Sequence, residues 1–309
     1  MKVAYTFPGQ GAQYVGMGKD LYGSSPEARS IFDKAEEILP EVGIKKLSFE
    51  GPIEDLTSTK NSQVTILVTS IACLEYLKAK IGSELEIVAC AGLSLGELTS
   101  LVAAGSISFE DAVKLVRTRG ELMEEASINN PGSMASIIGL DIAKLKEVCQ
   151  KSGAEIANLN CPGQVVISGK KKCVDDAMKL ANESGAKKSI LLNVSGAFHS
   201  SLMKEASEKF RIELEKVEFF KPAINVVANV TGDVESTPEE IRENLVKQLY
   251  SPVLWEDCVK KISSMGVSTF FEIGPGKVLK GLIKRIDPGL KVVNIEKSEG
   301  IKNLLSGNG

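Results

Sequence analysis

A serine between two glycines is the first feature of this chain that could do chemistry. The string Gly92-Leu93-Ser94-Leu95-Gly96 fits the G-x-S-x-G pattern of a nucleophile elbow, in which a sharp strand-to-helix turn pushes the serine out of the backbone. An apolar run precedes it at 86–91, and helix-forming residues follow at 97–104. A helix beginning there would direct its N–H groups and dipole at negative charge developing beside Ser94. The pattern favours a nucleophile, and a serine in an ordinary tight turn is the alternative.

The single histidine, His199, is the obvious base for such a serine. Imidazole titrates in the range that a general base needs, and a serine hydroxyl needs a base to become a nucleophile. A lone histidine with a structural role is the alternative. One imidazole and six scattered cysteines without a C-x-x-C pair predict neither a metal site nor a disulfide framework.

An arginine on an expected helix could supply positive charge. The apolar residues between 109 and 123 recur with helical spacing, and Arg119 falls about 70° from the centre of that face, whereas Arg117 falls about 90° from it. Arg119 is therefore the better placed of the two to point inward, where its planar fork would suit a carboxylate. A solvated arginine is the alternative.

A second glycine-rich turn, Phe7-Pro8-Gly9-Gln10-Gly11, follows the first apolar run of the chain. It could be a plain connection between a strand and a helix, or the second wall of an oxyanion hole. It is not a phosphate-binding loop, because no Gly-Lys-Ser/Thr follows and the G-x-G-x-x-G pattern is missing.

The elements that would position these residues alternate between strands and helices. Strands are expected at 2–7, 86–91, 225–230, 269–273 and 292–295, and helices at 28–39 and 63–80. Strand, tight glycine turn and helix in repetition indicate an α/β layer fold with a largely parallel sheet.

Between 131 and 195 the rhythm changes to β-α-β-β-α-β, the ferredoxin-like arrangement. Its strands are expected at 133–140, 155–159, 164–168 and 188–194, and its helices at 142–151 and 174–184. We therefore predict a large α/β catalytic domain, 1–130 and 196–309, with a small ferredoxin-like domain inserted at 131–195. Residues 306–309 are expected to form a frayed tail.

Composition excludes several classes of function. The chain has 309 residues with 43% hydrophobic and 25% charged residues, which is ordinary for a soluble globular protein. Its net charge of −3 provides no global positive field for nucleic acid. The longest apolar stretch, at 64–74, is shorter than the roughly 18 residues that a membrane span needs, and the N-terminal apolar run is too short for a signal peptide. We expect a cytoplasmic protein that binds neither nucleic acid nor membrane.

Together these pieces resemble the malonyl-CoA:acyl carrier protein transacylases and the related acyltransferase domains of fatty acid and polyketide synthases. The matching strings run in order through nearly the whole chain: 7–11, 92–97, 119–123, 158–164, 196–200, 248–253 with Trp255, and 272–277. Seven motifs in the right order make chance negligible. The resemblance implies a large α/β-hydrolase-like domain with a parallel sheet and an inserted ferredoxin-like domain.

The resemblance also implies roles for individual residues. Ser94 would be the nucleophile and His199 its base, and the backbone N–H groups of Gln10 and Leu95 would form the oxyanion hole. In this family a backbone carbonyl near the residue that matches Gln248 orients the histidine, so that the site is a dyad rather than a triad.

Further residues would contact the substrate. The resemblance implies that Arg119 pairs with the free carboxylate of the malonyl group, that Asn160 and Gln248 lie at the substrate site, and that Phe198, beside the base, accompanies malonyl rather than methylmalonyl use. The chain departs from the family at Leu93, where histidine usually stands. This departure removes a polar neighbour of the site but none of these roles.

The expected activity is transfer of malonyl from malonyl-CoA to the phosphopantetheine thiol of acyl carrier protein through a malonyl-serine intermediate, supplying fatty acid biosynthesis. Malonyl-CoA and acyl carrier protein would be the partners of a monomer that needs no metal or redox cofactor. An α/β-hydrolase-type esterase or thioesterase is the alternative, although its histidine lies close to the C-terminus and about a third of this chain follows His199. A non-catalytic docking subunit, which would need no working dyad, is a second alternative.

Overall fold

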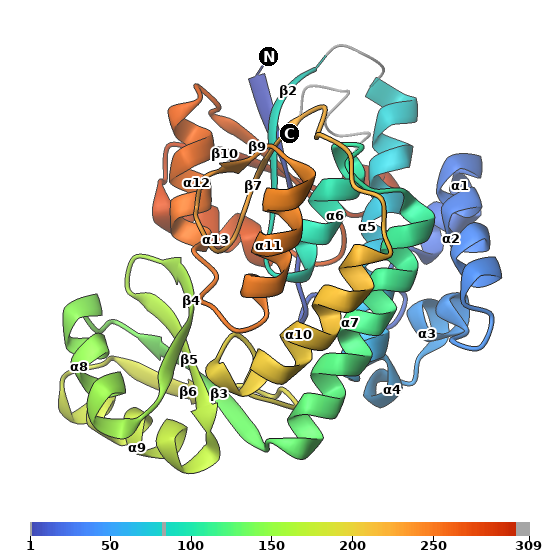
Figure 1. Cartoon of the computed structure of the whole chain (residues 1–309). Coiled ribbons are helices and arrows are strands. Elements are labelled where there is room, and N and C mark those ends of the chain that lie inside the picture. The colour runs from blue at the N-terminus through green and yellow to red at the C-terminus, as the bar shows by residue number, and fades with distance from the viewer. Residues whose placement is uncertain (1, 82–84, 301–309) are drawn as a thin grey trace.

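The computed structural model describes residues 2–81 and 85–300 and has the predicted α/β fold (Figure 1). Its larger sheet has six strands in the order β10-β9-β1-β2-β7-β8, of which all neighbouring pairs are parallel except β7 with β8. The strands are β1 (Lys2–Phe7), β2 (Glu86–Gly92), β7 (Asn225–Val227), β8 (Val234–Glu235), β9 (Thr269–Ile273) and β10 (Lys291–Ile295).

Helices cover both faces of this sheet. Successive side chains of a strand point to opposite faces, so both faces carry apolar side chains that need to be buried. Along β1, Val3, Tyr5 and Phe7 belong to the core beneath α5, α6 and α7, whereas Ala4 belongs to the core beneath α12 and α13. The helices of this part are α1 (Lys19–Ser24), α2 (Pro26–Ile38), α3 (Ile44–Glu50), α4 (Ile53–Thr57), α5 (Thr59–Ile81), α6 (Leu95–Ala103), α7 (Phe109–Asn129), α10 (Lys204–Glu215), α11 (Pro238–Gln248), α12 (Trp255–Ser264) and α13 (Val278–Ile286).

A separate antiparallel sheet has the strand order β4-β5-β3-β6. It is formed by β3 (Gly132–Ile138), β4 (Glu155–Cys161), β5 (Gln164–Lys170) and β6 (Lys188–Leu191), and it packs against α8 (Ile142–Ser152) and α9 (Lys171–Glu183) around a core of its own. Chain order and strand order are those of a ferredoxin-like unit. Boundaries between domains at 131 and 195 stay a prediction.

The two sheets meet along β4. The Leu159 N–H donates to the Val253 carbonyl at 2.9 Å, and the Val253 N–H donates to the Ala157 carbonyl at 2.9 Å. This pairing places β4 beside the segment that leads from α11 to α12. The ferredoxin-like sheet therefore closes over the carboxyl edge of the large sheet (Figure 1).

Several elements differ from the expected ranges. The strand expected at 225–230 ends at Val227, because the chain turns at Gly232, which has a φ of 65° and whose N–H donates to the Ala228 carbonyl. The strand expected at 188–194 ends at Leu191. The helix expected from 97 begins at Leu95, directly after Ser94.

Within residues 2–81 and 85–300, no helix is long and apolar enough to cross a membrane. The tail expected at 306–309 lies outside the described residues.

Candidate active site

Ser94 lies at the carboxyl edge of the large sheet, between the end of β2 and the start of α6. Its backbone has φ 54° and ψ −100°, a region that L-residues rarely adopt. The flanking glycines allow this turn, because a Cβ on Gly92 would overlap the Gly96 carbonyl and a Cβ on Gly96 would overlap the Phe7 carbonyl. This geometry is that of a nucleophile elbow, as the sequence pattern predicts.

His199 lies in the loop between β6 and α10, is 5% exposed and also has a positive φ, 57°. Its N–H donates to the Leu249 carbonyl at 3.1 Å, and its Nδ1 lies 2.7 Å from the Gln248 carbonyl oxygen. Since a carbonyl oxygen only accepts, Nδ1 carries the proton and Nε2 is left as the basic atom. Burial, with a smaller effect of the Arg119 charge, lowers the pKa of His199 to about 4.

Arg119 is 1% exposed and lies behind Ser94. Its Nη2 donates to Ser94 Oγ and to Gln248 Oε1, each at 3.0 Å, and its Nη1 donates to Gln63 Oε1. Burial lowers the pKa of this guanidinium to about 10, so that it remains charged at neutral pH. Within the described part of the chain no carboxylate lies at salt-bridge distance from it, and its Nε has no hydrogen-bond partner. The hydrogen-bond partners of this buried cation are therefore neutral groups, while the more distant charge of Glu97 raises its pKa against the larger effect of burial.

The two proposed oxyanion donors lie on separate turns. Gln10 follows β1, and Leu95 is the first residue of α6, where the helix dipole favours negative charge. Neither backbone N–H donates a hydrogen bond to any residue in the described ranges. Both donors are thus available to a bound group.

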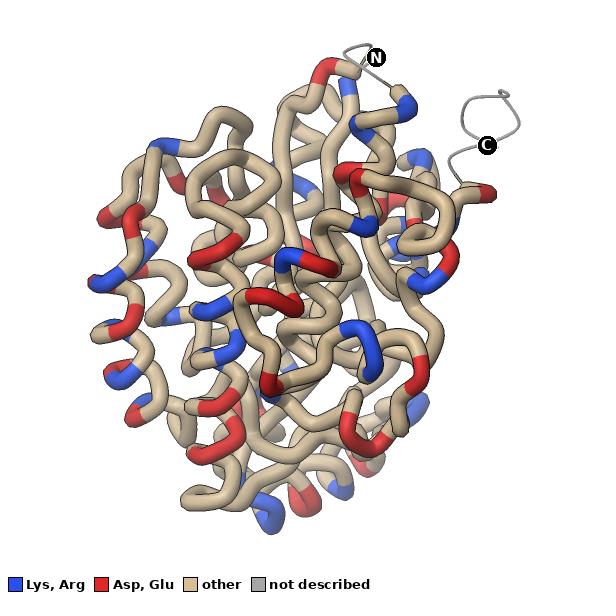
Figure 2. The backbone as a smooth tube through the Cα atoms, turned by 90° about the vertical axis from the view of Figure 1, so that its right-hand side faces the viewer, with Lys and Arg blue, Asp and Glu red and all other residues tan. Residues whose placement is uncertain are grey.

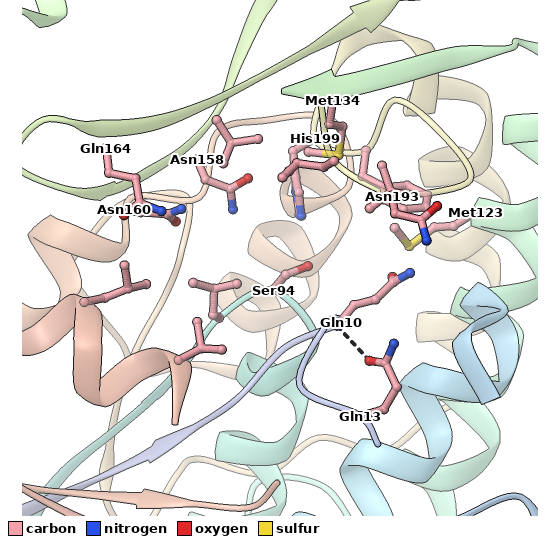
Figure 3. Close-up of a pocket in the computed structure, with 18 of the residues that line it drawn as sticks. Gln10, Gln13, Ser94, Met123, Met134, Asn158, Asn160, Gln164, Asn193 and His199 are labelled. Atoms are coloured by element: carbon pink, nitrogen blue, oxygen red, sulfur yellow. Dashed lines mark hydrogen bonds between the residues drawn. The ribbon is translucent and has the colours of Figure 1, made fainter. Parts of the chain in front are cut away.

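A cavity of about 230 Å³ opens beside Ser94, between the large sheet and the ferredoxin-like sheet (Figure 3). Of the predicted site residues, Gln10, Ser94, Asn160, Phe198 and His199 line it, while the buried residues Leu95, Arg119 and Gln248 are not part of its lining. Figure 3 shows Ser94 and His199 pointing into the same space from opposite sides. The same view shows Asn158, Asn160 and Gln164 grouped on the side of the ferredoxin-like sheet and Gln13 accepting from the Gly11 N–H.

The lining is mostly apolar around these polar groups. Leu93, at the position where the family usually has histidine, lines the cavity and packs with the core beneath α13. The remaining lining residues are Gly11, Gln13, Thr57, Met123, Met134, Asn158, Gln164, Val166, Leu192, Asn193, Val194, Val278 and Leu282.

Sequence reasoning missed three buried side chains of the site. Gln63, from α5, binds Arg119; Glu97 is fully buried in the first turn of α6; and Asn229 follows β7 and accepts from the Ser94 N–H at 2.7 Å. Burial raises the pKa of Glu97 to about 7, against the opposing hydrogen bond from the Asn229 N–H. The strand expected at 225–230 included Asn229, whereas β7 ends at Val227 and leaves Asn229 at the carboxyl edge of the sheet, where ligands bind in such folds.

An elbow serine, a buried histidine and free N–H donors at the carboxyl edge of an α/β sheet are the arrangement typical of enzymes that transfer or hydrolyse acyl groups. Residues 4–298 match the family model described as the acyl transferase domain. The chain is 48% identical over 306 residues to a malonyl CoA-acyl carrier protein transacylase of Bacillus subtilis, covering 97% of this chain and 95% of the relative.

Solved structures agree with this match. An acyl carrier protein S-malonyltransferase of Vibrio cholerae superimposes with a TM-score of 0.94 at 39% identity, covering 98% of this chain and all of the other. A malonyl-transacylase, solved in complex with its type II polyketide synthase acyl-carrier protein, superimposes on this chain with a TM-score of 0.95. The two chains are 38% identical, and 100% of both is covered. The chain belongs to the acyl transferase family, among the malonyl CoA-acyl carrier protein transacylases.

Proposed function

We propose that this chain transfers malonyl from malonyl-CoA to the phosphopantetheine thiol of acyl carrier protein, with Ser94 as the acyl carrier of the reaction. The observation that carries the proposal is the buried Arg119 guanidinium, which donates to Ser94 Oγ and has no carboxylate at salt-bridge distance in the described residues. A substrate carboxylate would supply the missing counter-charge, and a planar guanidinium binds it in a defined orientation.

The first half-reaction forms malonyl-Ser94. His199 Nε2 takes the Ser94 Oγ proton while Oγ attacks the thioester carbonyl, and the oxyanion is stabilised by the N–H groups of Gln10 and Leu95. Collapse of the tetrahedral intermediate breaks the C–S bond, and His199 returns the proton to the CoA thiolate. The Gln248 carbonyl keeps the Nδ1 proton in place throughout.

The second half-reaction reverses these steps with another thiol. The pantetheine thiol of the carrier protein gives its proton to His199 and attacks malonyl-Ser94, which releases the Ser94 hydroxyl. A groove beside the cavity, lined by Ile53, Glu54, Ser58 and Ser195, shares Gln10, Thr57, Asn193 and Val194 with it. This groove is the route we assign to the extended pantetheine arm, which CoA and the carrier protein have in common.

An α/β-hydrolase-type esterase is the less favoured function. Such enzymes orient their histidine with an Asp or Glu, whereas the Nδ1 of His199 faces the backbone carbonyl of Gln248. A buried guanidinium behind the nucleophile also has no role in hydrolysis of a simple ester. We further propose that the protein is a cytoplasmic monomer. It would supply malonyl units to fatty acid synthesis.

Intact mass measurement tests the function. Mixing the protein with malonyl-CoA should add one malonyl group at Ser94, and this acyl-enzyme should persist in water and be discharged by a pantetheine thiol. Rapid discharge by water alone would instead favour the hydrolase.

The rate of acylation should be nearly constant from pH 8 to about pH 5. Because burial lowers the pKa of His199 to about 4, its imidazole stays neutral, and therefore basic, well below the usual range. Protonation near pH 4 removes the base, so activity should fall there and not near pH 6.5. Stopped-flow acylation against pH, with circular dichroism to exclude acid unfolding, measures this; a half-maximal rate at pH 6 to 7 would contradict it.

Carrier-protein docking should depend on α13. Acyl carrier proteins are acidic, and this helix exposes Lys280, Lys284 and Arg285, with exposed Lys277 directly before it, while its Val278 and Leu282 line the cavity. Exposed Lys170–Lys172, at the start of α9, are the second basic set. Figure 2 shows basic and acidic residues interspersed along the backbone in the view from the right-hand side of Figure 1.

Reversing charge on α13 should lower the on-rate for carrier protein by about 10-fold at low salt and weaken its salt dependence. The variant is Lys280→Glu with Lys284→Glu, and Lys171→Glu with Lys172→Glu is its matched control. Transfer to free pantetheine should not change in either. Equal losses for both acceptors, or a larger effect of the α9 pair, would argue against docking on α13.

A further inference from the structure

The strained backbone of Ser94 needs partners that hold it. A residue in a sparsely populated φ/ψ region persists only where its surroundings over-determine it. Both peptide groups of Ser94 are bound by buried side-chain amides: its N–H donates to Asn229 Oδ1 at 2.7 Å, and its carbonyl accepts from Gln248 Nε2 at 3.1 Å. Gln248 already belongs to the site through Arg119 and His199, whereas Asn229 does not line the cavity and is linked to the site through its Oδ1, which also accepts from Gln248 Nε2 at 3.4 Å.

The Asn229 side chain connects two points of the elbow. Its Nδ2 donates to the Gly92 carbonyl at 2.8 Å while its Oδ1 accepts from the Ser94 N–H, so one amide spans the turn on both sides of Leu93. β2 and β7 pair in parallel up to Cys90 and Val226, and the amide continues this pairing beyond the strand. To make both hydrogen bonds, the side chain needs a donor and an acceptor on its terminal group. Asparagine provides both on a short side chain.

Glu97 orients Asn229 from the opposite side. Its Oε2 accepts from the Asn229 N–H at 2.6 Å, while the Asn229 carbonyl accepts from the Leu254 N–H at 2.8 Å. Glu97 is 0% exposed, and its Oε1 has no hydrogen-bond partner within residues 2–81 and 85–300. Burying a carboxyl group is costly unless hydrogen bonds compensate. The Asn229 N–H supplies the largest of the effects that oppose burial in setting the pKa of Glu97, ahead of the Gln248 side chain and the Arg119 charge.

We propose that Asn229, oriented by Glu97, is a positioning residue for acyl transfer. It fixes the Gly92 and Ser94 peptide groups, so that Ser94 Oγ and the Leu95 N–H meet the same thioester carbonyl in the correct geometry. This inference rests on the proposed role of Ser94 but not on malonyl as the acyl group. A misplacement of about 1 Å in such a site costs on the order of 100-fold in rate.

Asn229→Ala should therefore lower kcat for malonyl-CoA by about 100-fold and leave KM nearly unchanged. The burst of nitrophenol from p-nitrophenyl acetate, an activated ester without carboxylate or CoA, should slow by the same factor. This second readout separates the two ideas: a parent protein that reacts with the ester but not with malonyl-CoA fails the proposed function, while the comparison with Asn229→Ala still tests positioning.

Asn225→Ala is the matched control, because exposed Asn225, also on β7, donates to the Val88 carbonyl of β2 at 2.9 Å and lies away from the elbow. It should keep parental kinetics. Glu97→Gln, which retains an acceptor for the Asn229 N–H, should keep most of the kcat that Glu97→Ala loses. Parental kcat and burst in Asn229→Ala, or an equal loss in Asn225→Ala, would overturn the proposal.

If Asn229→Ala does not fold, the isosteric variant Asn229→Asp tests the same proposal. Its ionised carboxylate still accepts from the Ser94 N–H and cannot donate to the Gly92 carbonyl, so the burst should slow by about 10-fold at pH 8. A parental burst in this variant would equally overturn the proposal.

Discussion

Ser94→Ala is expected to accept no malonyl group from malonyl-CoA, because without Oγ no atom at the elbow can form the acyl-enzyme. Among the described residues, Thr57 also lines the cavity but lies at the end of α4 and not on a strand-to-helix elbow, while Ser58 and Ser195 line only the outer groove. Intact mass after mixing with malonyl-CoA measures the outcome. Stoichiometric labelling of the variant would show that another residue carries the acyl group.

His199→Ala is expected to slow acylation by about 10²- to 10⁴-fold, the usual contribution of a positioned general base. Ser94 would remain on its elbow, and the Gln10 and Leu95 donors would remain in place, so binding of malonyl-CoA should change little. Single-turnover acylation at pH 7.5 measures the loss. A rate near that of the parent protein would exclude His199 as the base.

Local patterns predicted much of the fold and the centre of the site. The elbow at 92–96 was predictable because strand, glycine turn and helix are set by neighbouring residues, and β1 and β9 have the expected bounds. Helical spacing alone predicted that Arg119 points to the interior, and the residue is 1% exposed in the structure. These predictions required only interactions between residues close in sequence.

The residues that were missed depend on contacts between distant segments. Asn229 and Ser94 are 135 positions apart, and Arg119 and Gln63 are 56 apart. The backbone carbonyl that binds His199 leaves no trace in residue type, and only the resemblance to the family pointed to Gln248. The range expected for β7 was too long because apolar residues continue past Val227, whereas the turn at Gly232 ends the strand.

In the proposed function, Arg119 is the residue that would favour a dicarboxylic acyl group over acetyl. A malonyl carboxylate loses its hydration on entering the site, and a guanidinium with an unpartnered buried Nε can compensate for that loss. The Arg119 guanidinium donates hydrogen bonds to the neutral side chains of Gln63, Gln248 and Ser94, which fix its position without neutralising its charge. Acetyl brings no carboxylate, so it gains nothing from this cation.

Arg119→Ala is therefore expected to lower kcat/KM for malonyl-CoA by roughly 30- to 4,000-fold, since removing one partner of a buried charge pair costs about 2–5 kcal/mol. Acetyl-CoA should hold steady or improve, and Arg119→Lys should recover only part of the malonyl activity, because a point charge lacks the planar fork.

Arg117→Ala is the control on the same helix, since Arg117 binds Glu121 and Asn61 rather than the site, and it should leave the preference between the two thioesters unchanged. The decisive quantity is the ratio of kcat/KM for malonyl-CoA to that for acetyl-CoA across the parent and the three variants. A common factor cancels from this ratio, so damage to the fold or to the Ser94 elbow cannot imitate loss of carboxylate recognition. If both thioesters fall equally in Arg119→Ala, the guanidinium only supports the structure, and malonyl selectivity must arise elsewhere in the cavity.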